Sequence, residues 1–194
     1  MVQDLINCHF NDALYHLNQA NYGSHLMIIY PDLDTLRELY SNYIHKQIEE
    51  NNEIVLVNPF YETADSVRRV LSEKFNHGMD ATKYEEENLL MIADSLQEYL
   101  GDQPYKYFKQ SLSNCREMRK NGLSVLADLG AYNHRYMHDD LVDHESSLST
   151  TTKDIGVPTK GFCLYHQKDF DRFSDEQQQK LIRHHDLALK MIKA

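Results

Sequence analysis

The chain has 194 residues, a length that fits one domain, and its hydrophobic content of 41% is ordinary for a folded globular protein. It carries 30 Asp and Glu residues against 20 Lys and Arg residues, and the net charge of −10 disfavours binding to nucleic acid or to an anionic membrane surface. The three cysteines, Cys8, Cys115 and Cys163, include no CxxC pair, so we expect neither a disulfide framework nor a structural zinc site, and we expect a reducing, cytoplasmic location.

Residues 1–22 are expected to form an N-terminal amphipathic helix that precedes the main domain. Over residues 3–20 the apolar side chains recur at the spacing of one helix face, at Ile6, Phe10, Ala13, Leu14 and Leu17. The polar residues between them interrupt any apolar signal sequence, and no apolar run in the chain is long enough to cross a bilayer. The stripe could contact a partner helix, form the seam of a homodimer, or pack back on its own domain.

Residues 23–194 alternate short apolar runs with helical patterns. Strands are expected at residues 25–30, 53–57, 89–93, 123–129 and 161–165. Helices are expected at residues 33–50, 63–75, 105–120 and 132–150, and a terminal helix begins at Ser174 with the capping-box pair Ser174 and Gln177. This alternation predicts an α/β three-layer sandwich, in which a mainly parallel central sheet of at least five strands has helices on both faces.

A parallel sheet of this kind binds ligands outside the carboxyl ends of its strands. The residues that the expected strands deliver to this edge combine aromatic rings with a few polar groups, a plausible lining for a small-molecule pocket. The predicted ligand-binding residues are Tyr30, Asn58, Phe60, Asp128, Tyr132, Tyr165, His166 and Lys168.

The turn after the first expected strand argues against nucleotide binding. A phosphate-binding loop needs glycines, a lysine and a Ser or Thr, whereas residues 30–34 read YPDLD and place two carboxylates there. No GxGxxG follows a strand, and no GxSxG nucleophile motif occurs. Cys163 lies in the middle of an expected strand and should be buried and inert. We therefore expect neither a cofactor nor an enzyme of these classes.

Two histidines suggest an alternative function, that of a metal-dependent enzyme. His134 and His138 are four residues apart on an expected helix, and with a nearby acid they could hold a divalent metal in a metal-dependent enzyme. Arg135 occupies the place where the metalloprotease helix has its Glu, so a polar helix face is the simpler interpretation. His184 and His185 are adjacent and should point in different directions, which makes them a poor pair of ligands.

Several stretches resemble a known family, the MEDS domain (methanogen/methylotroph, DcmR sensory domain). They are HLMIIYPDLDTLRELYSNYIHKQIEENNEIVLVNP, GLSVLADLGAYN, DHESSLS and KGFCLYHQKDFDRFS, and the similarity covers roughly residues 22–192. The resemblance implies a degenerate RecA-like or circadian-clock ATPase core without the phosphate loop, and a sensor of small hydrocarbon derivatives. It places His25, Asp128, Glu145 and Tyr165, followed by Lys168 and Phe170, at marker positions of the family. Asp128 stands where the family often has Glu, and His166 stands where it has Asp.

We therefore expect a sensory domain that binds a small ligand and signals through a partner such as a histidine kinase or a transcription regulator. One alternative is a ligand-free interaction module derived from a RecA-like ATPase. The other is the metal-dependent enzyme that uses His134 and His138.

Overall fold

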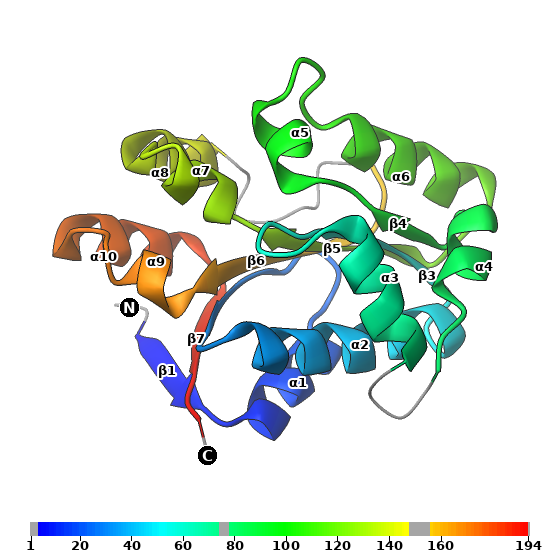
Figure 1. The fold of residues 1–194 in the computed structure, drawn as a ribbon, viewed down its shortest axis with the longest axis horizontal. Helices are drawn as coiled ribbons and strands as arrows, with labels where there is room; N and C mark the ends of the chain where they lie inside the picture. Colours follow the sequence, from blue (N-terminus) through cyan, green and yellow to red (C-terminus); the bar gives the residue numbers. More distant parts are fainter. Residues whose placement is uncertain (1–3, 74–77, 148–155, 194) are drawn as a thin grey trace.

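The computed structural model describes residues 4–73, 78–147 and 156–193, which form one seven-stranded sheet and the helices around it (Figure 1). The strands are β1 (Leu5–Cys8), β2 (His25–Tyr30), β3 (Glu53–Asn58), β4 (Leu90–Ile92), β5 (Gly122–Asp128), β6 (Thr159–His166) and β7 (Leu187–Met191). The helices are α1 (Phe10–Gln19), α2 (Leu33–Glu49), α3 (Ala64–Glu73), α4 (Ala81–Glu86), α5 (Ser95–Leu100), α6 (Lys106–Glu117), α7 (Gly130–His134), α8 (His138–Ser147), α9 (Gln167–Phe170) and α10 (Asp175–His184).

The sheet is parallel throughout, with the strand order β1-β7-β2-β6-β5-β3-β4. The predicted α/β class and the parallel sheet are therefore confirmed. Strand β2 lies inside the sheet and is buried along its whole length, as its unbroken apolar run predicts for a strand covered on both faces.

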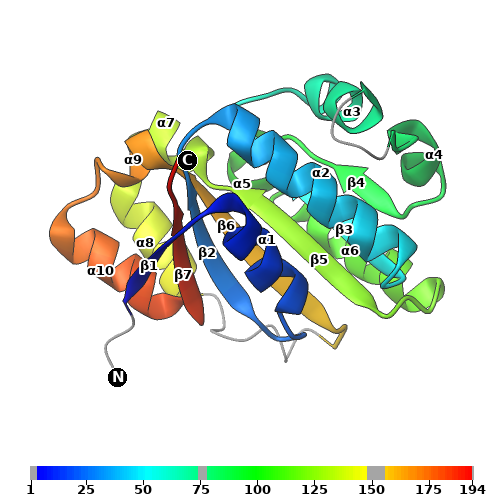
Figure 2. The ribbon, with the colours of Figure 1, turned by 90° about the horizontal axis from the view of Figure 1, so that it is seen from below.

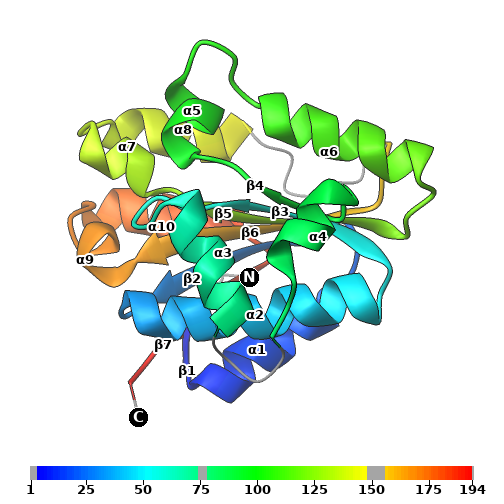
Figure 3. The same cartoon turned by 45° about the vertical axis from the view of Figure 1, so that its right-hand side comes forward.

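Helices cover both faces of the sheet, which gives the predicted three layers (Figures 1 and 3). One core cluster joins α1, α2, α3 and α4 to one face of the sheet. Two further clusters join α6, α8 and α10 to the opposite face. Because neighbouring residues of a strand point to opposite faces, Leu26 and Ile28 of β2 enter the first core, whereas Met27 and Ile29 enter the second.

The two ends of the chain differ from the prediction. Residues 5–8 form β1 rather than helix, and α1 begins at Phe10 with His9 at its N-cap. Strand β1 pairs with β7, a strand that the sequence analysis did not anticipate (Figure 2). The apolar face of α1 packs back on the domain against α2, where Ala13 and Leu17 are fully buried. Ile6, assigned to the helix stripe, lies in β1 and is 44% exposed.

One further helix prediction needs qualification, and one is confirmed. The helix expected at residues 132–150 is two helices, α7 and α8, separated at Tyr136, whose φ of 55° is left-handed. The last residues of that range, 148–150, lie outside the described residues. The terminal helix begins as predicted, since Ser174 and Gln177 form a capping box at the start of α10.

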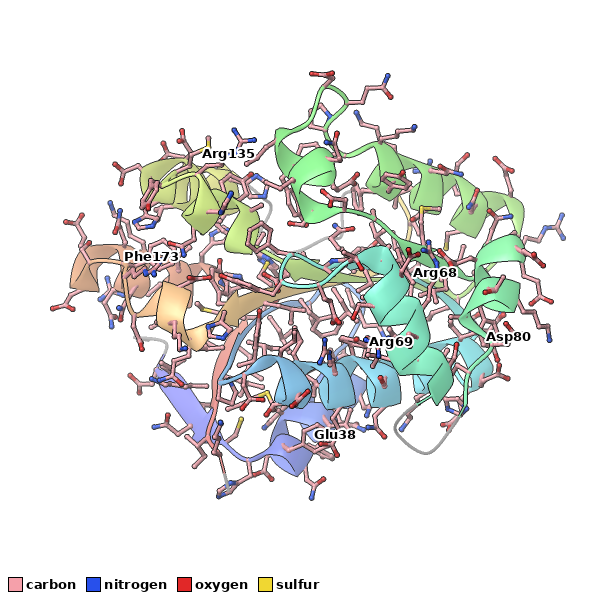
Figure 4. The ribbon with its side chains drawn as sticks, in the orientation of Figure 1. Glu38, Arg68, Arg69, Asp80, Arg135 and Phe173 are labelled. Carbon is pink, nitrogen blue, oxygen red and sulfur yellow. The ribbon has the colours of Figure 1, made fainter. Side chains whose placement is uncertain are left out.

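The net negative charge predicted no basic surface for nucleic acid, and the contacts of Arg68 agree with that prediction. Figure 4 labels Arg68 and Arg69 on α3, and the Arg68 guanidinium donates to Glu85 of α4 rather than contributing to a basic patch. Among the helices of the described residues, none is long and apolar enough to cross a membrane.

Candidate functional site

A cavity of about 440 Å³ lies between one face of the sheet and the helices α5, α6 and α8. Small residues on β5 and β6, among them Ala127, Gly161 and Cys163, leave this space beneath the helices. Its walls are mostly apolar and aromatic. The lining residues are His25, Leu56, Asn58, Glu98, Tyr99, Tyr105, Phe108, Lys109, Val125, Ala127, Leu129, His144, Glu145, Thr159, Gly161, Phe162 and Cys163.

The helices that roof the cavity are held in place by a buried carboxylate. Glu98 of α5 accepts hydrogen bonds from the backbone N–H groups of Tyr107 and Phe108, at 3.0 and 2.9 Å. It thereby satisfies two of the free N–H groups at the start of α6. Tyr105, next to this start, has a left-handed φ of 60°, which turns the chain into α6. Its hydroxyl lies 3.0 Å from His144 Nδ1 and so links α6 to α8.

One polar group of the wall has unused hydrogen-bonding capacity. Asn58, at the carboxyl end of β3, donates through Nδ2 to the Tyr99 hydroxyl at 3.0 Å. The other atom of this amide, Asn58 Oδ1, is buried and has no hydrogen-bond partner among the described residues. A buried unsatisfied acceptor is costly, and a ligand that donates a hydrogen bond would relieve that cost.

Four buried side chains meet at the wall of this cavity: His25, Glu145, Cys163 and His185. His25 Nε2 lies 3.0 Å from Cys163 Sγ and 3.5 Å from Glu145 Oε2. Burial raises the pKa of Glu145 to about 7 and lowers the pKa of His25 to about 2 and that of His185 to about 4. Burial thus disfavours the charged form of each of these three groups.

The Asp128 carboxylate lies on the opposite face of the sheet, next to α2. It accepts hydrogen bonds from the Tyr30 hydroxyl at 2.8 Å and from the backbone N–H of Gly130 at 2.9 Å. Burial raises its pKa to about 7, although both hydrogen bonds oppose this shift. Tyr30 and Asp128 therefore form a buried pair outside the 440 Å³ cavity.

A second hollow, of about 390 Å³, lies at the carboxyl ends of the strands. Its lining residues are Phe60, Tyr61, Asn133, His134, His166, Lys168, Asp169 and Arg172. Its wall is held together by Asp169, which accepts hydrogen bonds from the Tyr61 hydroxyl and the Asn133 amide. This hollow is more polar than the cavity under α5 and α6.

The eight predicted ligand-binding residues do not form one site; they lie in the cavity, in the strand-end hollow and in buried contacts outside both. Asn58 lines the cavity, and Phe60, His166 and Lys168 line the strand-end hollow. The remaining four are placed by their contacts. Tyr30 and Asp128 pair on the α2 face, Tyr165 donates to Glu145 at 2.8 Å, and the Tyr132 ring lies 5.4 Å from that of His144.

The four-residue cluster at the cavity wall was only partly visible in the sequence. The family resemblance pointed to His25 and Glu145, and Cys163 is buried as predicted. His185 was set aside because adjacent residues should point in different directions. In the fold the His185 ring meets that of His25, with ring centroids 4.2 Å apart, and the His184 ring lies 5.5 Å from that of His25. No spacing within the sequence relates these four residues, because each comes from a different segment.

His134 and His138, the alternative metal-binding pair, do not lie on one helix as their spacing in the sequence suggested. His134 ends α7 and His138 begins α8, so the two residues are not four apart on one helix. Arg135 lies at the break between the helices (Figure 4). His134 is exposed, and His138 Nε2 lies 2.7 Å from Asn133 Oδ1. The shared helix face expected for His134 and His138 was therefore wrong.

The turn after β2 holds a helix cap where a phosphate loop would lie. Asp32 is the N-cap of α2, and its carboxylate accepts from the backbone N–H of Thr35 at 2.9 Å. The same carboxylate lies 3.0 Å from Lys193 Nζ. In nucleotide-binding loops this helix N-terminus faces phosphate, and here a side-chain carboxylate occupies it.

Comparisons with known proteins agree with this architecture. The KaiC-like protein PH0186 from the hyperthermophilic archaeon Pyrococcus horikoshii OT3 is a solved structure with a similar fold, at a TM-score of 0.53 and 16% sequence identity. The match covers 84% of this chain and 70% of that one. No curated protein shows significant sequence similarity to the chain. The family profile of the methanogen/methylotroph, DcmR sensory domain matches residues 24–186. The chain, a parallel RecA-like α/β domain, therefore belongs to the MEDS family of sensory domains.

Proposed function

We propose that this domain senses a small, largely apolar molecule that binds in the cavity between the sheet and helices α5, α6 and α8. The observation that carries the proposal is the cavity itself. Its volume of about 440 Å³ lies within the range of roughly 300–1,000 Å³ that is usual for small-molecule sites. Asn58 Oδ1, which is buried beside the cavity and has no hydrogen-bond partner within the part of the chain that the structure describes, favours a ligand with one hydrogen-bond donor.

The chemistry at the start of α2 supports sensing over nucleotide hydrolysis. Asp32 places negative charge at the helix N-terminus that would otherwise face a phosphate group, so a nucleotide would meet repulsion there. Membership of a sensory-domain family points the same way. The signal would then pass to a partner protein, such as a histidine kinase or a transcription regulator, or through a homodimer.

The test is ligand-dependent stabilisation of the full chain. Benzyl alcohol, n-hexanol and cyclohexanone serve as probes, two with a hydroxyl donor and one without. A ligand that binds only the folded state raises the free energy of unfolding by about 2.7 kcal/mol at about 100 times its dissociation constant. We expect the two alcohols to stabilise the chain more than the ketone does.

Matched variants locate the binding site. Ala127→Leu adds bulk inside the cavity and should reduce or abolish stabilisation by the probes, because Ala127 lines the wall. Tyr99→Phe removes the hydroxyl that Asn58 donates to and should change the preference for the alcohols. Tyr107→Phe, on the neighbouring α6, leaves the lining unchanged and is the control. Equal stabilisation of wild type and the Ala127→Leu variant would place the ligand elsewhere, and no stabilisation by any probe would refute the proposal.

A further inference from the structure

The four side chains at the cavity wall have the composition of a transition-metal site. His25 opens β2, Cys163 lies in β6, Glu145 belongs to α8, and His185 follows α10. One ligand atom from each lies within 4.8 Å of all the others. Helices α8 and α10 pack together over this part of the sheet, which brings the four segments to one point (Figures 1 and 2).

Three of the six distances between these atoms match those of a tetrahedral site. Zinc lies about 2.0–2.3 Å from nitrogen, oxygen and thiolate ligands, so the corners of its tetrahedron are about 3.3–3.8 Å apart. Glu145 Oε2 lies 3.5 Å from His25 Nε2, 3.6 Å from His185 Nε2 and 3.7 Å from Cys163 Sγ. His25 Nε2 and Cys163 Sγ are somewhat closer, at 3.0 Å. The remaining two distances, from His185 to His25 and to Cys163, are within 4.8 Å, so binding an ion at the centre would require ligand shifts of up to about 1 Å.

The hydrogen bonds around His185 point its free nitrogen at this centre. His185 Nδ1 lies 2.7 Å from the backbone carbonyl oxygen of Leu181. A carbonyl oxygen only accepts, so Nδ1 carries the proton and Nε2 of the neutral ring presents a lone pair. That Nε2 atom is fully buried, has no hydrogen-bond partner among the described residues, and faces the Glu145 carboxylate. Two buried acceptors that face each other repel unless a proton or a cation lies between them.

The Glu145 carboxylate is oriented in the same manner. Its Oε1 atom accepts the Tyr165 hydroxyl at 2.8 Å, which leaves Oε2 directed at the other three side chains. Metal-binding histidines and carboxylates commonly have such an outer partner, a backbone carbonyl for the imidazole and a hydrogen-bond donor for the carboxylate. Within the described residues, no Lys or Arg forms an ion pair with Glu145.

We propose that His25, Glu145, Cys163 and His185 bind one divalent transition-metal ion of the zinc class. A thiolate with two imidazoles favours zinc or cobalt over magnesium or calcium, which prefer oxygen ligands. The thiolate and the carboxylate together balance the two positive charges of the ion. Binding a metal releases the Cys163 proton, because only the thiolate is a good ligand.

Three of the four residues, His25, Glu145 and Cys163, also line the cavity. The ion would therefore sit in the cavity wall, where a donor atom of a bound molecule could approach it. The metal proposal does not rest on the proposed sensing function, since the ion needs only the four protein side chains.

The test is a cobalt titration of the full chain, purified without an affinity tag and stripped with chelator. Tetrahedral Co²⁺ bound to a thiolate gives strong visible bands and a thiolate-to-cobalt charge-transfer band in the near ultraviolet. We expect one equivalent to saturate these bands and Zn²⁺ to remove them. Absence of the charge-transfer band in the wild-type chain would overturn the proposal.

Variants identify the ligands. Cys163→Ser should lose the charge-transfer band, whereas Cys115→Ser, a buried cysteine on α6, is the matched control and should keep it. Tyr165→Phe keeps all four ligands but removes the outer partner of Glu145, and should weaken metal affinity by about 10- to 100-fold. Circular dichroism of each metal-free variant checks that it folds. A band that survives Cys163→Ser would refute the assigned site.

The metal and ligand experiments can fail separately. The cobalt titration uses no organic probe, and the stabilisation assay is run on metal-free chain. Loss of the cobalt signal with intact stabilisation by alcohols would overturn the metal site alone.

Discussion

Replacing Asp128 by Asn should make the stability of this domain less dependent on pH. The Asp128 carboxyl is 1% exposed, and its neighbours are the Tyr30 hydroxyl and the Gly130 N–H. Burial raises its pKa from the usual 3.8 to about 7, so the folded state holds a proton that the unfolded state releases between these values. An Asn side chain resembles the protonated acid, because its NH₂ group can donate to the Tyr30 oxygen while its carbonyl oxygen accepts from Gly130.

The sign of the effect follows from proton binding. Between pH 4 and pH 7 the folded state binds more protons at Asp128 than the unfolded state does, so this group lowers stability as the pH rises. One pKa unit corresponds to about 1.4 kcal/mol, and the difference between 3.8 and about 7 amounts to a cost on the order of 4 kcal/mol at pH 8. Below pH 4 the cost is absent, because the acid is protonated in both states.

The assay is urea unfolding of the wild type and the Asp128→Asn variant at intervals from pH 4 to pH 8.5. The quantity of interest is the difference between their free energies of unfolding, in which the other titrating groups largely cancel. We expect this difference to move in favour of Asn by several kcal/mol as the pH rises. Asp175→Asn, at an exposed acid in the first turn of α10, controls for the loss of one negative charge. A difference that stays constant with pH would refute the assigned burial cost.

Two further predictions test other parts of the core. Lys160 Nζ lies 2.7 Å from Glu53 Oε1 in a buried ion pair, and Lys160→Met, which leaves that carboxylate without its cation, should cost about 3–5 kcal/mol in urea unfolding. Adding Glu53→Gln should recover part of the loss, and additive losses would contradict a direct interaction. Leu189 of β7 is fully buried, and Leu189→Ala should cost about 2–5 kcal/mol, measured by thermal or urea unfolding. An unchanged midpoint would mean that β7 does not belong to the core.

The five predicted strands, β2 to β6, were recognisable from apolar runs, and four of them lie inside the sheet, whereas β4 is at its edge. A strand covered by helices on both sides needs an unbroken apolar run, and HLMIIY in β2 and EIVLV in β3 are such runs. Strands β1 and β7 were missed because their apolar patterns are short and interrupted, although Ala188 and Leu189 of β7 are fully buried on opposite faces of the sheet. Residues 5–8 read LINC and residues 187–191 read LALKM, short segments with polar positions that carry little signal by themselves. They form strands because they pair with each other in the sheet, although most of the chain separates them in sequence.

The candidate site was predictable only in part, because alternate residues of a strand point to opposite faces. Sequence analysis can place Tyr30, Asn58 and Asp128 at the ends of strands, but which face each one meets depends on the register and on the helix above it. In the fold, Tyr30 and Asp128 face α2, whereas Asn58 faces the cavity under α5 and α6.

The sequence by itself determined the layered α/β class, the order of the central strands and helices along the chain, and the carboxylate at the start of α2. These features follow from local patterns: apolar periodicity, helix caps and the absence of a glycine-rich turn. Only the tertiary structure decided where the cavity lies and which four side chains meet at its wall. His25, Glu145, Cys163 and His185 are far apart or in different segments of the chain, and they converge because parallel pairing and helix packing bring β2, β6, α8 and the end of α10 together.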